Sequence, residues 1–104
     1  MLFKNRNFVY MLKCADGTLY TGWTNDIAHR LVSHRNGTAS KYTASRRPVM
    51  LFYLEECKDR SQAMKREIEI KKLSRKVKLA MGNVTAEMVD EITASSDKEE
   101  EYLK

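Results

Sequence analysis

The sequence predicts a single small α+β domain, and three observations support this fold class. Two segments rich in aromatic and β-branched residues, 8–14 and 18–23, flank a turn at Asp16-Gly17. A near-continuous apolar run from Val49 to Leu54 predicts a third, well-buried strand. Several other segments begin with a capping residue and continue in a helical pattern, which predicts helices beside the strands. At 104 residues the chain is long enough for one core but not for two.

The turn between the first two strands decides whether their tyrosines share a face. A two-residue turn would place Tyr10 and Tyr20 on opposite faces, because side chains alternate along a strand. A three-residue loop with Gly17 in the left-handed conformation instead pairs Cys14 with Thr18 and brings both tyrosines to one face. We predict the second register, since a shared site requires it.

The first helix is predicted over residues 26–36, with Thr24 or Asn25 as its N-cap and Gly37 as its stop. Residues 37–48 follow as a polar loop whose basic and aromatic side chains suit contacts with phosphate and with a base or sugar. A solvated connector is the alternative for this loop. The expected apolar face of the helix consists of Ile27, Ala28, Leu31 and Val32. The loop side chains expected to bind nucleic acid are Lys41, Tyr42, Arg46 and Arg47.

The second helix is predicted to start after Asp59 or Ser61 and to run to about residue 73. Glu67 falls near the middle of its apolar stripe, and Lys71 lies one turn further on. A carboxylate that faces the core is costly unless it is paired, hydrogen-bonded or bound to metal. Either a buried ion pair or a cation ligand would explain Glu67. The stripe consists of Ala63, Met64, Ile68 and Ile70, with Leu73 at its edge.

The C-terminal part should contain two further helices. Ser74 can cap a basic helix over 75–81, and Thr85 can cap another over 86–93, followed by a frayed acidic tail. We therefore divide the chain into a domain of residues 1–84 and a C-terminal helix with a flexible tail over 85–104.

The charge of the chain is unevenly distributed. Residues 1–82 contain 17 Lys and Arg against 7 Asp and Glu, a net charge of +10, whereas residues 83–104 carry a net charge of −5. A basic body indicates a polyanionic partner, because Lys and Arg release counterions when they neutralise phosphates. Ordinary solubilising charge is the alternative. The acidic tail could fold back over the basic face.

Composition excludes several other classes of protein. No apolar run is long enough to span a membrane, and no secretory signal is recognisable. Cys14 and Cys57 have no metal-ligand spacing and are expected to be reduced thiols packed in a cytoplasmic protein. Neither a glycine-rich phosphate loop nor a Gly-x-Ser-x-Gly motif is present.

The polar residues on the predicted strands and helices supply the groups that phosphodiester hydrolysis needs. Tyrosine can act as a general base if a neighbour takes up its proton, and arginine stays protonated and fits phosphate oxygens. Arg30 and His34 are four residues apart on the edge of the first helix, so they can reach one point. A single carboxylate with water and substrate oxygens can hold Mg²⁺. Each residue alone would more often be structural, and their joint occurrence favours a one-metal nuclease.

At this point the chain resembles the GIY-YIG nuclease superfamily. Its first signature is present as Phe8-Val9-Tyr10 and its second as Tyr20-Thr21-Gly22, and the helices with Arg30, His34 and Glu67 complete the pattern. The likeness covers about residues 6–82. Asn-Gly at 36–37 and the segments 41–43 and 46–48 resemble the small stand-alone bacterial members, the YhbQ/YazA type.

The resemblance implies a GIY-YIG endonuclease-like α+β fold with a small three-stranded antiparallel or mixed sheet flanked by helices. It also implies metal-dependent DNA nicking of the kind used in excision repair. The roles it assigns are general base for Tyr10, orientation of water or phosphate for Tyr20, transition-state stabilisation for Arg30, assistance through a hydrogen bond for His34, and binding of Mg²⁺ or Mn²⁺ for Glu67. Lys71 would join the nucleic-acid contacts.

Two departures from the superfamily pattern matter. Trp23 stands where several relatives carry lysine, and it could stack on substrate or pack in the core. Asn83 is a candidate for the asparagine that some relatives carry after the metal-binding helix. The implied partner is branched or single-stranded DNA, with a protein partner for targeting as a further expectation. A non-catalytic or partner-dependent nucleic-acid-binding module of the same fold is the alternative to the enzyme.

Overall fold

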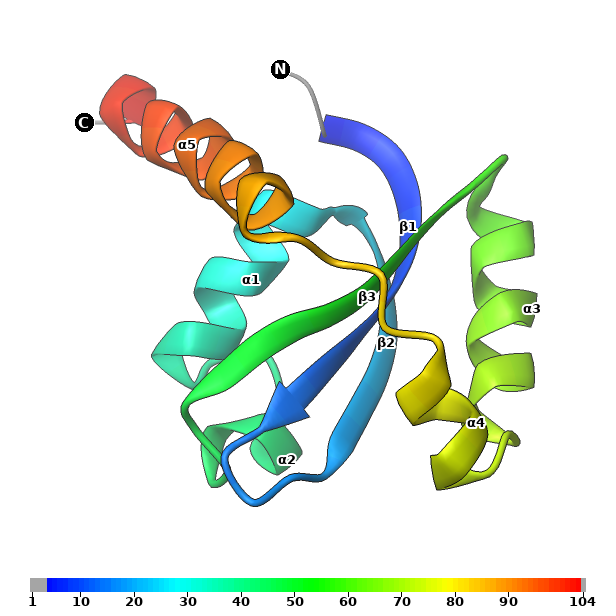
Figure 1. Ribbon diagram of the computed structural model, residues 1–104. Coiled ribbons are helices and arrows are strands. Elements are labelled where there is room, and N and C mark those ends of the chain that lie inside the picture. Colours follow the sequence, from blue (N-terminus) through cyan, green and yellow to red (C-terminus); the bar gives the residue numbers. More distant parts are fainter. Residues whose placement is uncertain (1–3, 104) are drawn as a thin grey trace.

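Three antiparallel strands in the order β2-β1-β3 form the centre of the molecule, with helices on both faces (Figure 1). The computed structural model describes residues 4–103. The elements in chain order are β1 (Lys4–Cys14), β2 (Leu19–Asp26), α1 (Ile27–Asn36), α2 (Lys41–Ala44), β3 (Val49–Cys57), α3 (Arg60–Lys71), α4 (Arg75–Ala80) and α5 (Ala86–Leu103). The α+β prediction is confirmed, and the sheet is antiparallel throughout.

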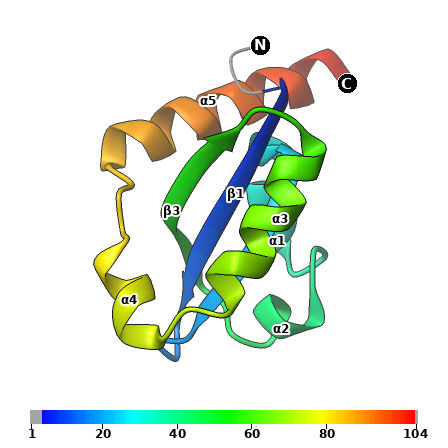
Figure 2. The same ribbon diagram turned by 90° about the vertical axis from the view of Figure 1, so that its right-hand side faces the viewer.

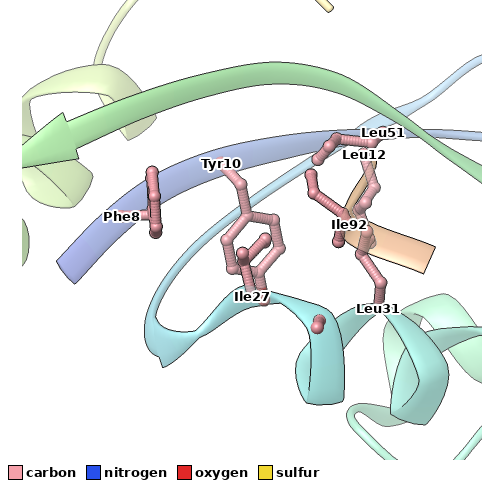
Figure 3. Packing of buried hydrophobic residues seen from close by; sticks show 8 residues of the cluster. Phe8, Tyr10, Leu12, Ile27, Leu31, Leu51 and Ile92 are labelled. Atoms are coloured by element: carbon pink, nitrogen blue, oxygen red, sulfur yellow. The ribbon is translucent and has the colours of Figure 1, made fainter. Parts of the chain in front are cut away.

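Alternation along β1 divides the core into two clusters. Phe8, Tyr10 and Leu12 face α1 and α5, whereas Val9 and Met11 face α3. Figure 3 places Tyr10 within the first cluster, close to the side chains that α1 contributes. Because β1 is the central strand, both of its faces are buried. The first cluster consists of Phe8, Tyr10, Leu12, Ile27, Ala28, Leu31, Leu51 and Ile92, and the second of Val9, Met11, Tyr53, Cys57, Ala63 and Ile70.

The hairpin between β1 and β2 has the predicted three-residue loop. The amide of Cys14 donates to the carbonyl of Thr18 at 2.9 Å, and Gly17 adopts a left-handed φ of 84°. Leu12 pairs with Tyr20 in the resulting register. Tyr10 and Tyr20 therefore lie on one face of the sheet, as a shared site requires.

The helix α1 differs from its prediction at the N-terminus and on its buried face. Asp26, not Thr24 or Asn25, is the N-cap, because its carboxylate accepts from the amide of His29 at 3.2 Å. His34 is fully buried instead of lying on the edge, and Val32 is only half-buried. Gly37 ends the helix as predicted. The buried residues of α1 are Ile27, Ala28, Leu31 and His34.

The segment 37–48 is not loop throughout, because α2 occupies its centre. Ser40 caps this short helix by accepting from the amide of Thr43 at 3.1 Å. Four residues are too few to produce a helical hydrophobic pattern, which explains why the sequence predicted only a polar loop. The fold thereby gains a hydrogen-bonded turn in which Thr43 is buried.

Asp59 caps α3 as one of the two predicted alternatives, but only part of the expected apolar stripe is buried. Met64 and Ile68 are 43% and 53% exposed, whereas Ala63 and Ile70 are buried against the sheet. Positions 63 and 70 lie two turns apart, and Glu67 falls between them on the same face. The inward orientation of Glu67 is therefore confirmed, although two of its predicted neighbours face solvent.

The helix α5 is longer than predicted and packs against α1 (Figures 1 and 2). Thr85 caps it as expected, but the helix continues to Leu103 because residues 86–103 include neither glycine nor proline. Ile92 is buried in the first core cluster. In both views α5 lies at the opposite end of the molecule from α2, so it does not fold back over that basic segment. The expected flexibility of the tail stays a prediction, and Lys104 lies outside the described residues.

Two smaller findings complete the fold. Cys14 and Cys57 are buried free thiols, as expected from their spacing. Within residues 4–103, no helix has both the length and the apolar character needed to cross a membrane.

Candidate active site

A pocket of about 250 Å³ opens beside β2, the strand at one edge of the sheet. Helix α1 contacts β2 from one face and α3 contacts it from the other. Residues from both faces therefore meet at this edge. The pocket is lined by Tyr10, Tyr20, Gly22, Trp23, Thr24, Asn25, Arg30 and Glu67, which include four of the five predicted catalytic residues.

Tyr10 lies at the inner wall of this pocket, with only its hydroxyl engaged in polar contact. Its Oη lies 2.8 Å from Nε2 of His34. Burial, with a smaller contribution from Tyr20, raises the pKa of Tyr10 well above its ordinary value of 10.0, although the charge of Arg30 opposes this. Tyr10 is therefore a neutral phenol at pH 7, and it can accept a proton only if it passes its own proton on.

Gly22 allows Tyr10 to occupy this position. The two residues are directly opposite each other in the β1–β2 register. A Cβ atom on Gly22 would lie 2.6 Å from the Tyr10 hydroxyl and 2.8 Å from the ring carbon that bears it. The glycine of the second signature is thus required by close approach of the ring. Sequence analysis did not assign it to the site.

His34 lies behind Tyr10 and does not line the pocket. Its Nε2 faces Tyr10 and its Nδ1 lies 2.9 Å from Oγ1 of Thr43. Burial, followed by the positive charge of Arg30, lowers the pKa of His34 to about 4. The neutral ring can accept a proton from Tyr10, but it is too deeply buried to touch a substrate directly. Thr43 was not predicted as a site residue, although the segment 41–43 carried part of the family resemblance.

Arg30 and Tyr20 form the wall nearer to solvent. Among the described residues, none forms a hydrogen bond or an ion pair with the Arg30 guanidinium, so its donors are available to a ligand in the pocket. The Tyr20 ring packs edge-on against His34, with centroids 5.2 Å apart, and lies 6.0 Å from the ring of Tyr42. This aromatic row links the pocket to the exposed side of α2.

Glu67 reaches the pocket from α3 on the other face of the sheet. Its side chain is 20% exposed, and Oε1 accepts from Lys71 Nζ at 3.2 Å. The ion pair that sequence analysis considered is therefore present. No donor from the described residues engages Oε2, which leaves that oxygen available to a ligand.

The Glu67 carboxylate fits Mg²⁺ or Mn²⁺ as a metal ligand. Residues 4–103 contain no cluster of three or more acidic, histidine or cysteine side chains that could enclose a metal. Magnesium usually retains several waters and is bound by one or two carboxylates together with substrate phosphate oxygens. The half-buried Glu67 carboxylate beside a polar pocket matches that mode of binding.

The basic residues of the loop have different environments. Tyr42 is 38% exposed, and the guanidinium carbon of Arg46 lies 3.8 Å above its ring. Arg46 also binds Asp16 at 3.1 Å, while Arg47 donates to the carbonyl of Ala44 at 3.0 Å. Both arginines therefore hold the loop in place. Lys41 is exposed on α2, and together with the exposed Tyr42 it is the part of the loop most accessible to a ligand.

Asn83 lies away from the pocket, and Trp23 combines a packing role with a place in the pocket wall. Asn83 pairs through its side-chain amide with both backbone groups of Leu54, at 2.9 Å each. It therefore lies at the β3 edge, opposite the pocket. Trp23 packs against the second core cluster beneath Arg60 and also lines the pocket, so packing does not prevent it from facing a ligand.

Comparison with known proteins gives a consistent result. The family model of the GIY-YIG catalytic domain matches residues 6–80. A UPF0213 protein of Clostridium perfringens is 45% identical over 98 residues, which cover 94% of this chain and 95% of that protein. A UPF0213 protein of Staphylococcus saprophyticus is 48% identical over 77 residues, which cover 74% of this chain and 94% of that protein. The names of these relatives state no activity.

A solved structure is similar as well. The solution NMR structure of a protein from E. faecalis matches with a TM-score of 0.53 and 43% sequence identity, covering 74% of this chain and 82% of that one.

Proposed function

Because the chain belongs to the GIY-YIG catalytic-domain family, a family of nuclease type, we propose that it is a divalent-metal-dependent endonuclease or nickase acting on DNA phosphodiester bonds. One observation carries this proposal. Tyr10, Tyr20, Arg30 and Glu67 come from four different elements and line the same pocket. Their side chains supply the proton acceptor, the positive charge and the metal-binding carboxylate that this hydrolysis needs.

The proposed reaction begins with a water held beside Tyr10 and Tyr20. Tyr10 accepts a proton from this water and transfers its own proton to Nε2 of His34, at 2.8 Å. The raised pKa of Tyr10 argues against a resident phenolate, and the lowered pKa of His34 keeps its ring neutral at pH 7, although the same burial makes the ring a weaker base. Proton removal by this pair therefore needs no charged tyrosine before substrate binds.

Arg30 and Glu67 handle the phosphate. The Arg30 guanidinium donates to the non-bridging phosphate oxygens, whose charge increases in the transition state. Glu67 is the residue that would hold Mg²⁺ or Mn²⁺, together with waters and substrate oxygens. When bound, the ion would supply Lewis-acid stabilisation of the leaving oxygen.

We propose a structure-selective substrate, such as a branch, a flap or a single-stranded junction, in DNA repair or processing. The pocket of about 250 Å³ accommodates one phosphodiester group rather than a duplex. Lys41 and Tyr42 extend the contact surface beside Tyr20, where an unpaired base can stack. Arg46, Arg47 and Lys71 add positive charge around it. Action on DNA in the cytoplasm, with a protein partner for targeting, belongs to the same proposal.

A non-catalytic or partner-dependent nucleic-acid-binding module is the second candidate. The ion pair between Glu67 and Lys71 favours it, because that pair compensates the half-buried carboxylate without any metal. The two candidates differ in their response to divalent cations. Cations weaken simple phosphate binding by competition, whereas cleavage requires them.

The deciding experiment is cleavage of end-labelled branched, flapped, single-stranded and linear DNA and RNA with Mg²⁺ or Mn²⁺, and with EDTA as control. We expect cleavage of branched or single-stranded DNA that EDTA abolishes. Loss of one preorganised electrostatic partner costs about 10²–10³ in rate, so Arg30→Ala and Glu67→Gln should each lose at least that much.

Matched variants separate the site from its surroundings. Glu69→Gln changes an exposed carboxylate on α3, and Arg35→Ala removes an exposed cation from α1. Both should cleave at close to the wild-type rate. Near-wild-type cleavage by Arg30→Ala and Glu67→Gln would refute the assignment. Binding to every substrate without cleavage would favour the binding module.

A further inference from the structure

Thr43 makes an unusual number of polar contacts for a fully buried hydroxyl. Its Oγ1 lies 2.9 Å from Nδ1 of His34, 3.0 Å from Oγ of Ser40, and 3.4 Å from the carbonyl oxygen of Ser40. Ser40 in turn caps α2 by accepting from the amide of Thr43 at 3.1 Å. The first turn of α2 therefore fixes the position of the hydroxyl that faces His34.

We infer that Thr43 is a positioning residue, whose hydroxyl holds His34 as the tautomer with its proton on Nδ1, so that Tyr10 donates to Nε2. The catalytic consequence rests on the proposed function, whereas the tautomer itself does not. A neutral imidazole has one donor and one acceptor nitrogen, and the partner of one nitrogen sets the role of the other.

The hydrogen-bond inventory distinguishes the two tautomers. With the proton on Nδ1, His34 donates to Thr43, Thr43 donates to the carbonyl of Ser40, and Tyr10 donates to Nε2. Each of these three donors then has an acceptor within the protein. A carbonyl oxygen can only accept, so the contact between Thr43 and Ser40 is a hydrogen bond only if Thr43 donates.

The opposite tautomer loses hydrogen bonds that the protein otherwise makes. If Nε2 carried the proton, it would donate to Tyr10, and Thr43 would have to donate to Nδ1 instead of to the Ser40 carbonyl. The Tyr10 hydroxyl proton would then have no acceptor among the described residues and would depend on a molecule in the pocket. The geometry therefore favours the proton on Nδ1.

This tautomer matches the proposed proton path. When water gives a proton to Tyr10, the Tyr10 proton moves to Nε2, and His34 becomes an imidazolium whose Nδ1 still donates to Thr43. The water oxygen forms its bond to phosphorus as the bond from phosphorus to the leaving oxygen breaks. Thr43 needs no change of role during the step, since it accepts from Nδ1 before and after transfer.

The tautomer can be measured on the full chain without any nuclease assay. We would record long-range ¹H–¹⁵N correlations of ¹⁵N-histidine-labelled protein at neutral pH, with a His29→Gln variant to assign the two rings. The wild type should show a protonated, pyrrole-like Nδ1 and an unprotonated, pyridine-like Nε2 at His34. A protonated Nε2 would overturn the inference.

Three substitutions complete the test. Thr43→Val removes the hydroxyl at nearly constant volume and should shift His34 toward the other tautomer or a mixture. Thr43→Ser keeps the hydroxyl and should restore the wild-type signature. Thr21→Val is the matched control, because Thr21 is also buried but its hydroxyl has no hydrogen-bond partner among residues 4–103, and the His34 signature of this variant should be unchanged. An unaltered tautomer in Thr43→Val would reject the role of Thr43.

Cleavage provides the second readout. For Thr43→Val we expect kcat to fall about 10- to 100-fold with little change in KM, less than the roughly 10²–10⁴-fold that an acid–base group itself contributes, because Thr43 acts through His34, and Thr43→Ser should recover most of this loss. Equal losses in both variants would point to a merely structural role and contradict the inference. If the wild type shows the predicted tautomer but cleaves no substrate, the proposed function fails while the assignment of the tautomer stands.

Discussion

At the level of single residues, burial sets the protonation states of the site more than charge does. Burial is the largest cause of the pKa shifts of both Tyr10 and His34, and the charge of Arg30 comes after it. The sequence predicted these residues but placed His34 on the edge of α1. Hydrophobic patterns treat histidine as polar, so they could not reveal that Thr43 and Tyr10 would satisfy both of its nitrogens in the core.

The lowered pKa of His34 predicts a specific dependence of stability on pH. Its folded value is about 4, below the ordinary value of 6.5, so the unfolded chain binds the proton more tightly. The resulting contribution of His34 to the free energy of unfolding is fully present above pH 6.5. It is lost as the pH falls toward 4, by at most about 1.4 kcal/mol per pH unit. Urea denaturation at pH 7, 6, 5 and 4 would measure it.

The His34→Gln variant is the comparison for this experiment. Its free energy of unfolding should depend less steeply on pH between 6.5 and 4 than that of the wild type. Asp16 and Glu56 also have lowered pKa values, but they are present in both proteins, so their contribution to the slope cancels in the comparison. Identical slopes for the two proteins in that window would show that His34 does not titrate as described.

At the level of elements, local turn chemistry predicted more of the structure than helical periodicity did. Asp16-Gly17 fixed the register of β1 and β2 and hence the shared face of the tyrosines. Periodicity located α3 and the inward face of Glu67, but it misplaced Met64 and Ile68, because a helix packed on one face of a small sheet buries only a narrow strip. The helix α2 depends on one cap at Ser40 and left no periodic pattern.

The close packing of Tyr10 on β2 predicts the effect of Gly22→Ala. The added Cβ would overlap the Tyr10 ring and displace its hydroxyl from His34. We expect a loss of about 1–3 kcal/mol in stability, as for other overpacked sites, together with loss of cleavage. Urea denaturation and the cleavage assay would measure the two effects.

Gly17→Ala is the control for this substitution. Gly17 has a left-handed φ of 84° but open space around it, with the nearest atom at 3.8 Å. Alanine there should cost about 1 kcal/mol through backbone strain and should leave the contact between Tyr10 and His34 intact. If Gly22→Ala retained wild-type cleavage, the close approach would not matter for the site.

At the level of the whole molecule, the core extends beyond the predicted boundary at residue 84. Ile92 on α5 is buried together with Leu31 and Leu51 from the main body. The sequence could not reveal this contact, since it depends on how α5 packs on α1 across a long separation along the chain. The C-terminal helix thus contributes to the stability of the part that carries the site.

Ile92→Ala tests this contribution. Removing a fully buried isoleucine side chain should lower the free energy of unfolding by about 2–5 kcal/mol. Chemical denaturation would measure it, with Met50→Ala as control because Met50 is 63% exposed and should change stability by no more than about 0.5 kcal/mol. Equal stabilities of the two variants would mean that α5 does not support the core.

The charge of the C-terminal segment should have little effect on binding to DNA. Helix α5 and helix α2 lie at opposite ends of the molecule in both views (Figures 1 and 2), and electrostatic interactions are screened over about 10 Å at 0.1 M salt. Replacing Glu99, Glu100 and Glu101 by glutamine should raise affinity less than about twofold at that salt concentration. Fluorescence anisotropy with labelled single-stranded DNA would measure the change.

Lys41→Gln provides the positive control and should weaken binding under the same conditions, because Lys41 is exposed beside Tyr42. A large rise in affinity for the glutamine variant at 0.1 M salt would instead support a segment that folds back over the basic face.

Because Glu67 lies on the far face of the sheet, the site can be completed only late in synthesis. Tyr10, Tyr20, Arg30 and His34 leave the ribosome within the first third of the chain, whereas Glu67 follows only after β3, the strand that completes the sheet. A nascent chain can therefore hold the proton-transfer residues without the carboxylate. If the proposed function holds, the site becomes competent for cleavage only when the third strand and its helix have docked.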